Sequence, residues 1–174
     1  MIEYKILTRD PDSFFELLTD DLIGQHCILV DSEPELLQMY KFAALEEAER
    51  YCNRAICETT IQISTDYRTF RLPYGCTMIT SESVDSEGQT VDGKFNHVSG
   101  EMIIRGNPVF PVFITAKSRV ENSSALLTAI AMIIATKYQN RESVVVGTIS
   151  SELPYNHTRI LDLYRLPNLT TGRN

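Results

Sequence analysis

The amino-acid sequence predicts an α+β fold, with a mainly helical core and a small antiparallel β insertion between the N-terminal and C-terminal helices. Three observations lead to this prediction. Apolar residues recur at every third or fourth position between residues 36 and 55, as on one face of a helix. From residue 59 to residue 116 the period changes to two, which is typical of strands. A second helical stretch, residues 124–141, is apolar on nearly every face.

The chain begins with a candidate edge strand, because residues 2–7 alternate between apolar and polar side chains. The pair Asp10-Pro11 ends this pattern. A short helix around Phe14 is expected next, and Thr19 can cap another short helical turn.

The clearest helix signal starts at Ser32, where Pro34 and Glu35 complete a capping-box pattern with proline in the first turn. Spacings of three and four then predict a buried face made of Leu36, Leu37, Tyr40, Ala44, Ala48, Tyr51 and Ala55. The opposite, solvent-facing side is expected to carry Lys41, Glu46, Glu49, Arg50 and Asn53.

The β insertion, residues 59–116, is expected to hold several short strands separated by turns rich in glycine, proline and acidic residues. Pro111 suggests that the last of these strands, residues 109–116, is an edge strand or contains a bulge. Strands this short are expected to need the helices, or a neighbouring subunit, to bury one face.

The helix at residues 124–141 is the expected centre of the core, with Ile130 and Ile134 buried. It carries more apolar surface than one partner helix can cover, so its excess faces are candidates for a subunit contact. A final helix is expected at residues 156–164. Residues 1–165 are predicted to form a single domain, followed by a tail, residues 166–174, that is mobile in isolation.

Composition argues against several functional classes. The net charge of −7 and the dispersed basic residues argue against a protein that grips nucleic acid by neutralising phosphates. The four cysteines and three histidines lack the spacing of a metal site, and no glycine-rich phosphate loop is present. The longest apolar run is too short for a membrane span. We therefore expect no enzymatic activity, no cofactor, no metal site and no membrane association.

The end of the apolar helix carries an abrupt polar cluster of Tyr138, Arg141 and Glu142. One reading is that the two charges hold the helix end to a neighbouring element through charge-assisted hydrogen bonds. The alternative is a solvated helix end, with the tyrosine anchoring the buried helix and its hydroxyl reaching water.

Several segments, taken in order, carry a resemblance to a known family. They are LTDDLIGQHCIL at residues 18–29, LLQMYKFAALEEAERY at 36–51, FRLP at 70–73, AIAMIIATKYQNRE at 129–142 and ILDLYR at 160–165. An apolar helix with an aromatic-x-Asn-Arg-Glu end, followed by a loop and a closing Leu-x-x-Tyr-Arg, resembles the head–tail connector proteins of tailed bacteriophages, also called adaptor or head-completion proteins. Relative to that family, residues 1–17 look like an N-terminal extension.

The resemblance implies a structural virion protein at the head–tail junction, present in the host cytoplasm during assembly. It implies a homo-oligomeric ring, commonly of twelve subunits, that lies below the portal protein and extends the DNA channel. A tail or stopper protein would bind the ring, and double-stranded DNA would pass without specific binding. No cofactor is implied. An acidic chain suits such a channel, because a negative wall repels phosphate.

The resemblance also suggests where contacts lie. The C-terminal segments of the family often engage the portal, so subunit or portal contacts are expected at Tyr138, Arg141, Glu142, Tyr164, Arg165, Leu166 and Leu169. Channel lining is expected from the carboxylates Asp85, Glu87 and Asp92, unless they merely solvate the outer surface. Two other functions stay open: a tail-completion or other virion module, and a small cytosolic enzyme or regulator with an unrecognised site.

Overall fold

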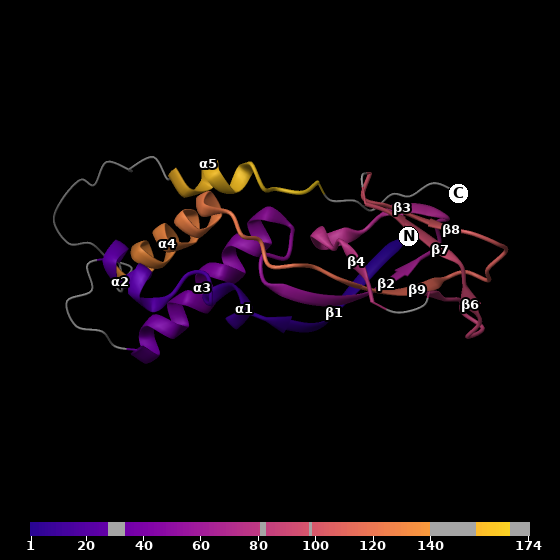
Figure 1. Ribbon diagram of the computed structural model, residues 1–174, viewed down its shortest axis with the longest axis horizontal. Helices are drawn as coiled ribbons and strands as arrows, with labels where there is room; N and C mark the ends of the chain where they lie inside the picture. Colours follow the sequence, from indigo (N-terminus) through magenta and orange to yellow (C-terminus); the bar gives the residue numbers. More distant parts are fainter. Residues whose placement is uncertain (28–33, 81–82, 98, 140–155, 168–174) are drawn as a thin grey trace. The chain divides into compact units, whose positions relative to one another are not determined.

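The computed structural model describes residues 1–27, 34–80, 83–97, 99–139 and 156–167 (Figure 1). The chain divides into two compact units. The first, which we call the β unit, contains residues 1–10 and 53–120, together with Leu166 and Pro167. The second, the helical unit, contains the described residues between 11 and 52 and between 121 and 165. Each unit is therefore assembled from segments that are separate in the sequence.

The β unit contains two antiparallel sheets. The larger has the strand order β1-β2-β9-β5-β6, and β4 also pairs with β9. These strands are β1 (Ile2–Asp10), β2 (Glu58–Thr65), β4 (Met78–Ile79), β5 (Ser83–Val84), β6 (Thr90–Val91) and β9 (Val112–Lys117). The smaller sheet has the order β3-β8-β7, with β3 (Thr69–Arg71), β7 (Gly93–Asn96) and β8 (Glu101–Ile104). A 3₁₀ turn, η1 (Pro73–Gly75), follows β3.

Alternating apolar residues give the β unit its own hydrophobic core. Along β2, Ile61 and Ile63 point inward, opposite Ala116 and Ile114 of β9. Since side chains of paired residues lie on the same face of a sheet, these four residues form a continuous buried row. The same cluster includes residues of the smaller sheet, namely Phe70, Met102 and Ile104.

The predicted edge strand is confirmed and is longer than expected. β1 pairs with β2 from Ile2 to Asp10, with a register shift between Ile6 and Thr8, and it stands at one end of the strand order. Ile2 belongs to the buried cluster, so the first residues of the chain are part of the β unit. The expectation for Pro111 is wrong, because β9 begins just after it and lies inside the sheet between β2 and β5.

The predicted fold class, a mainly helical core with a small β insertion, is wrong. The protein is a mixed α+β structure with two antiparallel sheets that bury their own core. Local periodicity describes each short strand alone and carries no information about its partners. Pairing of residues 2–10 with β2 and association of a second sheet supply the partners that a two-stranded ribbon would lack.

The helical unit contains α1 (Asp12–Phe15), α2 (Asp20–Cys27), α3 (Pro34–Cys52), α4 (Ser124–Gln139) and α5 (Asn156–Asp162). α4 contacts α2, α3 and α5, and Figure 1 shows it between α3 and α5. Ile130 and Ile134 are fully buried, as predicted for the centre of a core. Among the helices of the described residues, none is long and apolar enough to cross a membrane.

The burial of α3 agrees with the prediction on one face and contradicts it on the other. Ala44 and Ala48 are fully buried as expected, but Lys41 and Glu49, expected in solvent, are also buried. For Lys41, contacts with α1 and α2 explain the difference. The Lys41 ammonium lies 2.6 Å from an Asp20 carboxylate oxygen and 4.5 Å from the centre of the Phe15 ring, so its charge is satisfied although its stem is covered.

Candidate functional site

The candidate functional features of the described residues are exposed surfaces and anchored segments. Cys52, Cys57 and Cys76 are buried free thiols. Desolvation by burial raises the pKa of Cys76 to about 12, so this thiol stays protonated at neutral pH. Within the described ranges, no three His, Cys, Asp or Glu residues are grouped so that they could hold a metal ion.

The closing helix, α5, is fastened to the end of α3. The Tyr51 hydroxyl donates a hydrogen bond to an Asp162 carboxylate oxygen at 2.6 Å, and this bond raises the pKa of Tyr51 above its ordinary value of 10.0. The Cys52 thiol donates to the backbone carbonyl of Leu161 at 3.4 Å. The guanidinium of Arg165 lies 5.6 Å from the centre of the Tyr51 ring, a cation–π arrangement. α5 therefore depends on polar as well as apolar contacts.

Two of the predicted contact residues thus have contacts inside the helical unit. Arg165 covers the Tyr51 ring, and the Tyr164 hydroxyl forms a hydrogen bond with the Ser123 hydroxyl just before α4. Leu166 belongs to the β unit, where it is half-buried beside Gly75. These contacts give Tyr164, Arg165 and Leu166 structural roles that do not require a partner protein.

The end of α4 is held against α3. The rings of Tyr138 and Tyr40 meet edge to face, with centroids 6.2 Å apart. Near them the Lys137 ammonium lies 2.7 Å from a Glu47 carboxylate oxygen. Tyr138 therefore acts as an anchor of the helix. The other predicted contact residues, Arg141, Glu142 and Leu169, lie outside the described residues.

The three carboxylates proposed for channel lining differ in their surroundings. Asp85 is only 6% exposed, and its carboxylate accepts backbone N–H groups from Gln89 at 2.9 Å, Glu87 at 3.0 Å and Val109 at 3.4 Å. These bonds, that of Gln89 first, lower the pKa of Asp85. Its charge therefore organises the turn between β5 and β6. Glu87 and Asp92 are exposed, and Asp92 lies 4.0 Å from Arg105.

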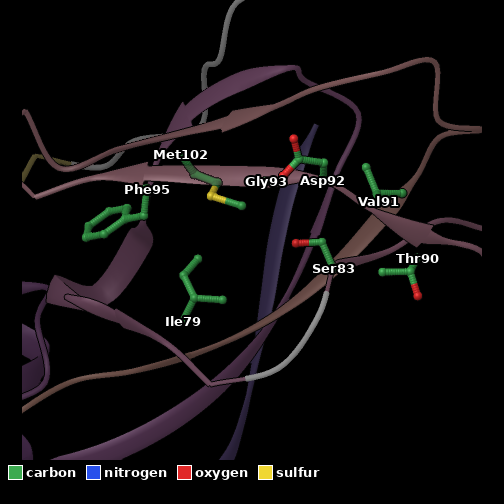
Figure 2. Close-up of a pocket in the computed structure, with 8 residues that line it drawn as sticks. All are labelled: Ile79, Ser83, Thr90, Val91, Asp92, Gly93, Phe95 and Met102. Atoms are coloured by element: carbon green, nitrogen blue, oxygen red, sulfur yellow. The ribbon is translucent and has the colours of Figure 1, made fainter.

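A pocket of about 550 Å³ opens in the β unit where β4, β5 and β6 approach β7 and β8. Figure 2 shows Ile79 and Phe95 on one side of this pocket and Val91 on the other. Ser83 and Asp92 add polar groups to its lining. The pocket is thus mostly apolar with a polar margin, which is the composition expected of a binding surface.

An exposed apolar strip lies on β1. Tyr4, Ile6 and Leu7 are 42%, 41% and 47% exposed, although Tyr4 and Ile6 pair with the buried residues Ile63 and Ile61 of β2. Tyr4 and Ile6 therefore lie on the core side of the sheet at its edge, where cover by other elements is incomplete, and Leu7 lies at the register shift of β1. The ring of Tyr4 stacks on the ring of Tyr74, with centroids 5.7 Å apart, and this contact covers only part of the strip. Alternation in the sequence indicated the strand but not this exposure.

No family model and no curated protein sequence matches the chain. Solved structures do match. A chain from the "virion of native gene transfer agent (GTA) particle" aligns with a TM-score of 0.72 at 16% identity, covering 98% of this chain and 99% of that one. A chain from the neck of the empty GTA particle, computed with C6 symmetry, aligns with a TM-score of 0.67 at 16% identity, covering 99% of this chain and 100% of that one.

A third structure, the neck of the native GTA particle computed with C12 symmetry, gives a TM-score of 0.61 at 14% identity over the whole length of both chains. Identities this low establish similarity of fold. The alignments cover nearly all of each chain, so the likeness includes both the β unit and the helical unit. The protein therefore has the fold of chains found in gene transfer agent particles.

Proposed function

We propose that this protein is a structural virion protein that forms a ring in the neck of a phage-like particle, between the head and the tail. The observation that carries the proposal is the full-length likeness to GTA particle chains, two of which come from necks. The sequence segments that resemble head–tail connector proteins, taken in chain order, independently support a location in the neck. A structural role also agrees with a site made of surfaces and anchored helices.

We propose a ring of twelve copies. The neck structures with this fold were computed with C6 and C12 symmetry, and a twelve-subunit ring is compatible with both operators. A cyclic ring requires a head-to-tail contact between two different surfaces of the same chain. The exposed strip of β1 and the pocket of the β unit are two such surfaces.

We propose that the ring lies below the portal protein, binds a tail or stopper protein on its other side, and extends the channel for DNA. Because Tyr164 and Arg165 are occupied within the helical unit, the portal contact is assigned to the chain after Pro167, including Leu169, and to Arg141 and Glu142. Removing residues 168–174 should leave the melting temperature unchanged and reduce the amount of this protein on isolated heads. A lowered melting temperature would instead place these residues in the fold.

Of the three carboxylates, we propose Glu87 as the strongest candidate for lining the channel. It is exposed at the tip of the β5–β6 turn, and among the described residues no ion pair or hydrogen bond reaches its carboxylate. The net charge of −7 is repeated in every copy, so a ring would surround DNA with negative potential. Such a wall lets DNA move without adhering.

Deleting the gene tests the function directly. Cells that make the particle but lack this protein should accumulate DNA-filled heads without tails, and the full-length protein supplied from a plasmid should restore complete particles. Cryo-electron microscopy of the restored particles should show a ring of this fold at the neck. Complete, tailed particles formed in the absence of the protein would contradict the proposal.

A further inference from the structure

We infer that the end of the tail, residues 168–174, covers the exposed strip of β1 in a free copy of this protein and leaves it when that copy attaches to the portal. The occupant of the strip is a segment of the same chain, with Leu169 as its apolar anchor. This inference rests on the proposed function, because it adds a regulation to the segment that is proposed to reach the portal. Residues 168–174 lie outside the described residues, and the described chain ends at Pro167.

The strip of β1 is an incompletely covered part of the core side of the larger sheet. Tyr4 and Ile6 pair with buried isoleucines of β2, so they share a face with the core residues of that strand. Both side chains are nevertheless exposed. Lys5, between them, pairs with the exposed Gln62 and lies on the opposite face. A cover for the strip must therefore approach from the core side of the sheet.

The described chain ends beside this same surface. The ring of Tyr4 stacks on the ring of Tyr74 in η1, and Tyr74 packs against the core of the β unit. The next residue, Gly75, lies close to Leu166, because a Cβ atom on Gly75 would be 3.6 Å from the Leu166 Cδ1 atom. All of these residues belong to the β unit. The end of the tail thus starts at the element that already covers part of the strip.

The sequence of the tail suits this short path. Pro167 restricts Leu166 to an extended or polyproline II conformation. Because polyproline II has three residues per turn, a continuation of this conformation brings Leu169 to the same side as Leu166. Three residues span at most about 10 Å, which carries Leu169 from η1 onto the strip. A tether this short gives an effective concentration on the order of millimolar, so the chain's own tail is favoured over a second copy at lower concentration.

The contact acts as a shield that the portal removes. Leu169 cannot lie on the strip and in a portal site at once, so attachment to the portal frees the strip. The strip is one of the two surfaces proposed for the ring, and its cover delays contact between copies until each is on the portal. A cover held by few apolar residues opens far below the temperature at which the β unit unfolds, so its loss leaves the melting temperature unchanged.

Two engineered cysteines test the position of Leu169. In a Cys27→Ser background, which leaves only buried native thiols, the full-length variant Ile6→Cys with Leu169→Cys should form an intramolecular disulfide on mild oxidation. The product should stay monomeric, and mass spectrometry should identify the linked peptides. The matched control, Lys5→Cys with Leu169→Cys, moves the first cysteine by one residue to the opposite face of β1 and should give no link.

The cross-linking outcomes separate this contact from others. Equal linking of both cysteine pairs would mean that the tail visits the strand without settling on the strip, and this would overturn the inference. Disulfide-linked dimers from the Ile6→Cys and Leu169→Cys variant would place the tail of one copy on another and would overturn it too. Absence of any link from that variant has the same consequence.

Fluorescence tests the same contact without cross-links. The chain contains no tryptophan, so Leu169→Trp adds a single indole to the tail. Adding Ile6→Lys, which places a charge in the strip, should shift the emission to longer wavelength and increase quenching by acrylamide. Lys5→Glu, on the opposite face of β1, is the control and should leave the emission unchanged. An emission that Ile6→Lys does not alter would contradict the inference. Circular dichroism confirms that the variants are folded.

Isolated heads test the release of the tail. The disulfide-linked Ile6→Cys and Leu169→Cys protein should bind heads weakly, and reduction of the disulfide should restore binding. The Lys5→Cys and Leu169→Cys protein should bind equally with and without the reducing agent. Equal binding of the linked and the reduced protein would show that attachment does not require the tail to leave the strip, and would contradict the release.

The inference and the proposed function can fail separately. Particles with this protein in the neck, but without an intramolecular link in the free protein, would leave the function standing and remove the shield. An intramolecular link in a protein that is absent from particle necks would do the reverse.

Discussion

At the scale of single residues, the buried carboxylate of Asp85 stabilises the turn in which it lies. Its oxygens accept three backbone N–H groups of the β5–β6 turn and the neighbouring loop, which lowers its pKa below the ordinary 3.8. The stabilisation is therefore fully present above a pH of about 3.8 and is lost as the pH falls through the lowered pKa.

Asp85→Asn should consequently lower the melting temperature at neutral pH, because the amide accepts these bonds less strongly than a charged oxygen. The difference between wild type and variant should shrink when melts are repeated well below pH 3.8. Glu87→Gln, an exposed position in the same turn, is the control and should have little effect. A constant difference at every pH would show that the charge of Asp85 is not responsible.

Ile134 provides the corresponding test of the helical core. Its side chain is fully buried on α4, so Ile134→Asp places an unpaired charge in an apolar interior. The cost is several kcal/mol, which is about half or more of the stability of a typical domain. We expect insoluble or unfolded protein, whereas Thr128→Asp, on the exposed side of the same helix, should remain soluble and folded. A soluble Ile134→Asp protein with a cooperative melt would contradict the burial of this face.

At the scale of elements, one of the hydrogen bonds that hold α5 can be removed without disturbing the apolar contacts. Tyr51→Phe keeps the ring under Arg165 and deletes only the bond to Asp162. We expect faster amide exchange in α5 and unchanged exchange at the centre of α4. Tyr40→Phe, which preserves the ring contact with Tyr138, is the matched control and should leave α5 protected.

The same bond gives α5 a dependence on alkaline pH. Since the folded pKa of Tyr51 lies above its ordinary value, the stabilisation is present below a pH of about 10 and is lost as the pH rises through the folded pKa. In Tyr51→Phe this alkaline loss of α5 protection should disappear. Equal alkaline sensitivity in wild type and variant would assign the effect to other groups.

The elements differ in how far the sequence alone could predict them. The core role of α4 and the edge strand at β1 follow from local periodicity, which records the environment of each face. The burial of Lys41 does not, because it depends on Asp20 and Phe15, which approach α3 only in the folded chain. The two-sheet core likewise depends on pairing between β1 and β2, which are distant in sequence. Long-range pairing leaves no local pattern.

The candidate surfaces were still harder to predict. The residues of the exposed strip of β1 alternate as they would in a covered edge strand, so the sequence does not reveal that their side chains are exposed. Their exposure depends on how far other elements cover the edge of the larger sheet. The pocket arises where strands of both sheets meet. Gly93 is one signal of the pocket in the sequence, because a Cβ atom at this position would lie 2.1 Å from the terminal methyl of Met102. An isolated glycine in a strand, however, does not specify which residue approaches it.

At the scale of the whole molecule, the two units suggest a division of labour within the proposed ring. The β unit carries the exposed strip of β1 and the pocket, and the helical unit holds its closing helix through polar anchors. Because Asp85 is buried and Asp92 lies 4.0 Å from Arg105, the carboxylate left for the DNA channel is in the β5–β6 turn. Glu87 occupies the tip of this turn.

Glu87→Lys tests that assignment in assembled particles. The change replaces one negative charge by one positive charge in every copy, and a ring repeats it around the DNA path, where phosphate would be attracted to the wall instead of repelled. We expect particles with normal composition that eject DNA more slowly than wild type, with the delay reduced at high salt because screening weakens phosphate contacts. Glu46→Lys makes the same charge change on the exposed side of α3 and controls for net charge alone. Ejection from Glu87→Lys particles at the wild-type rate and salt dependence would place this turn outside the channel.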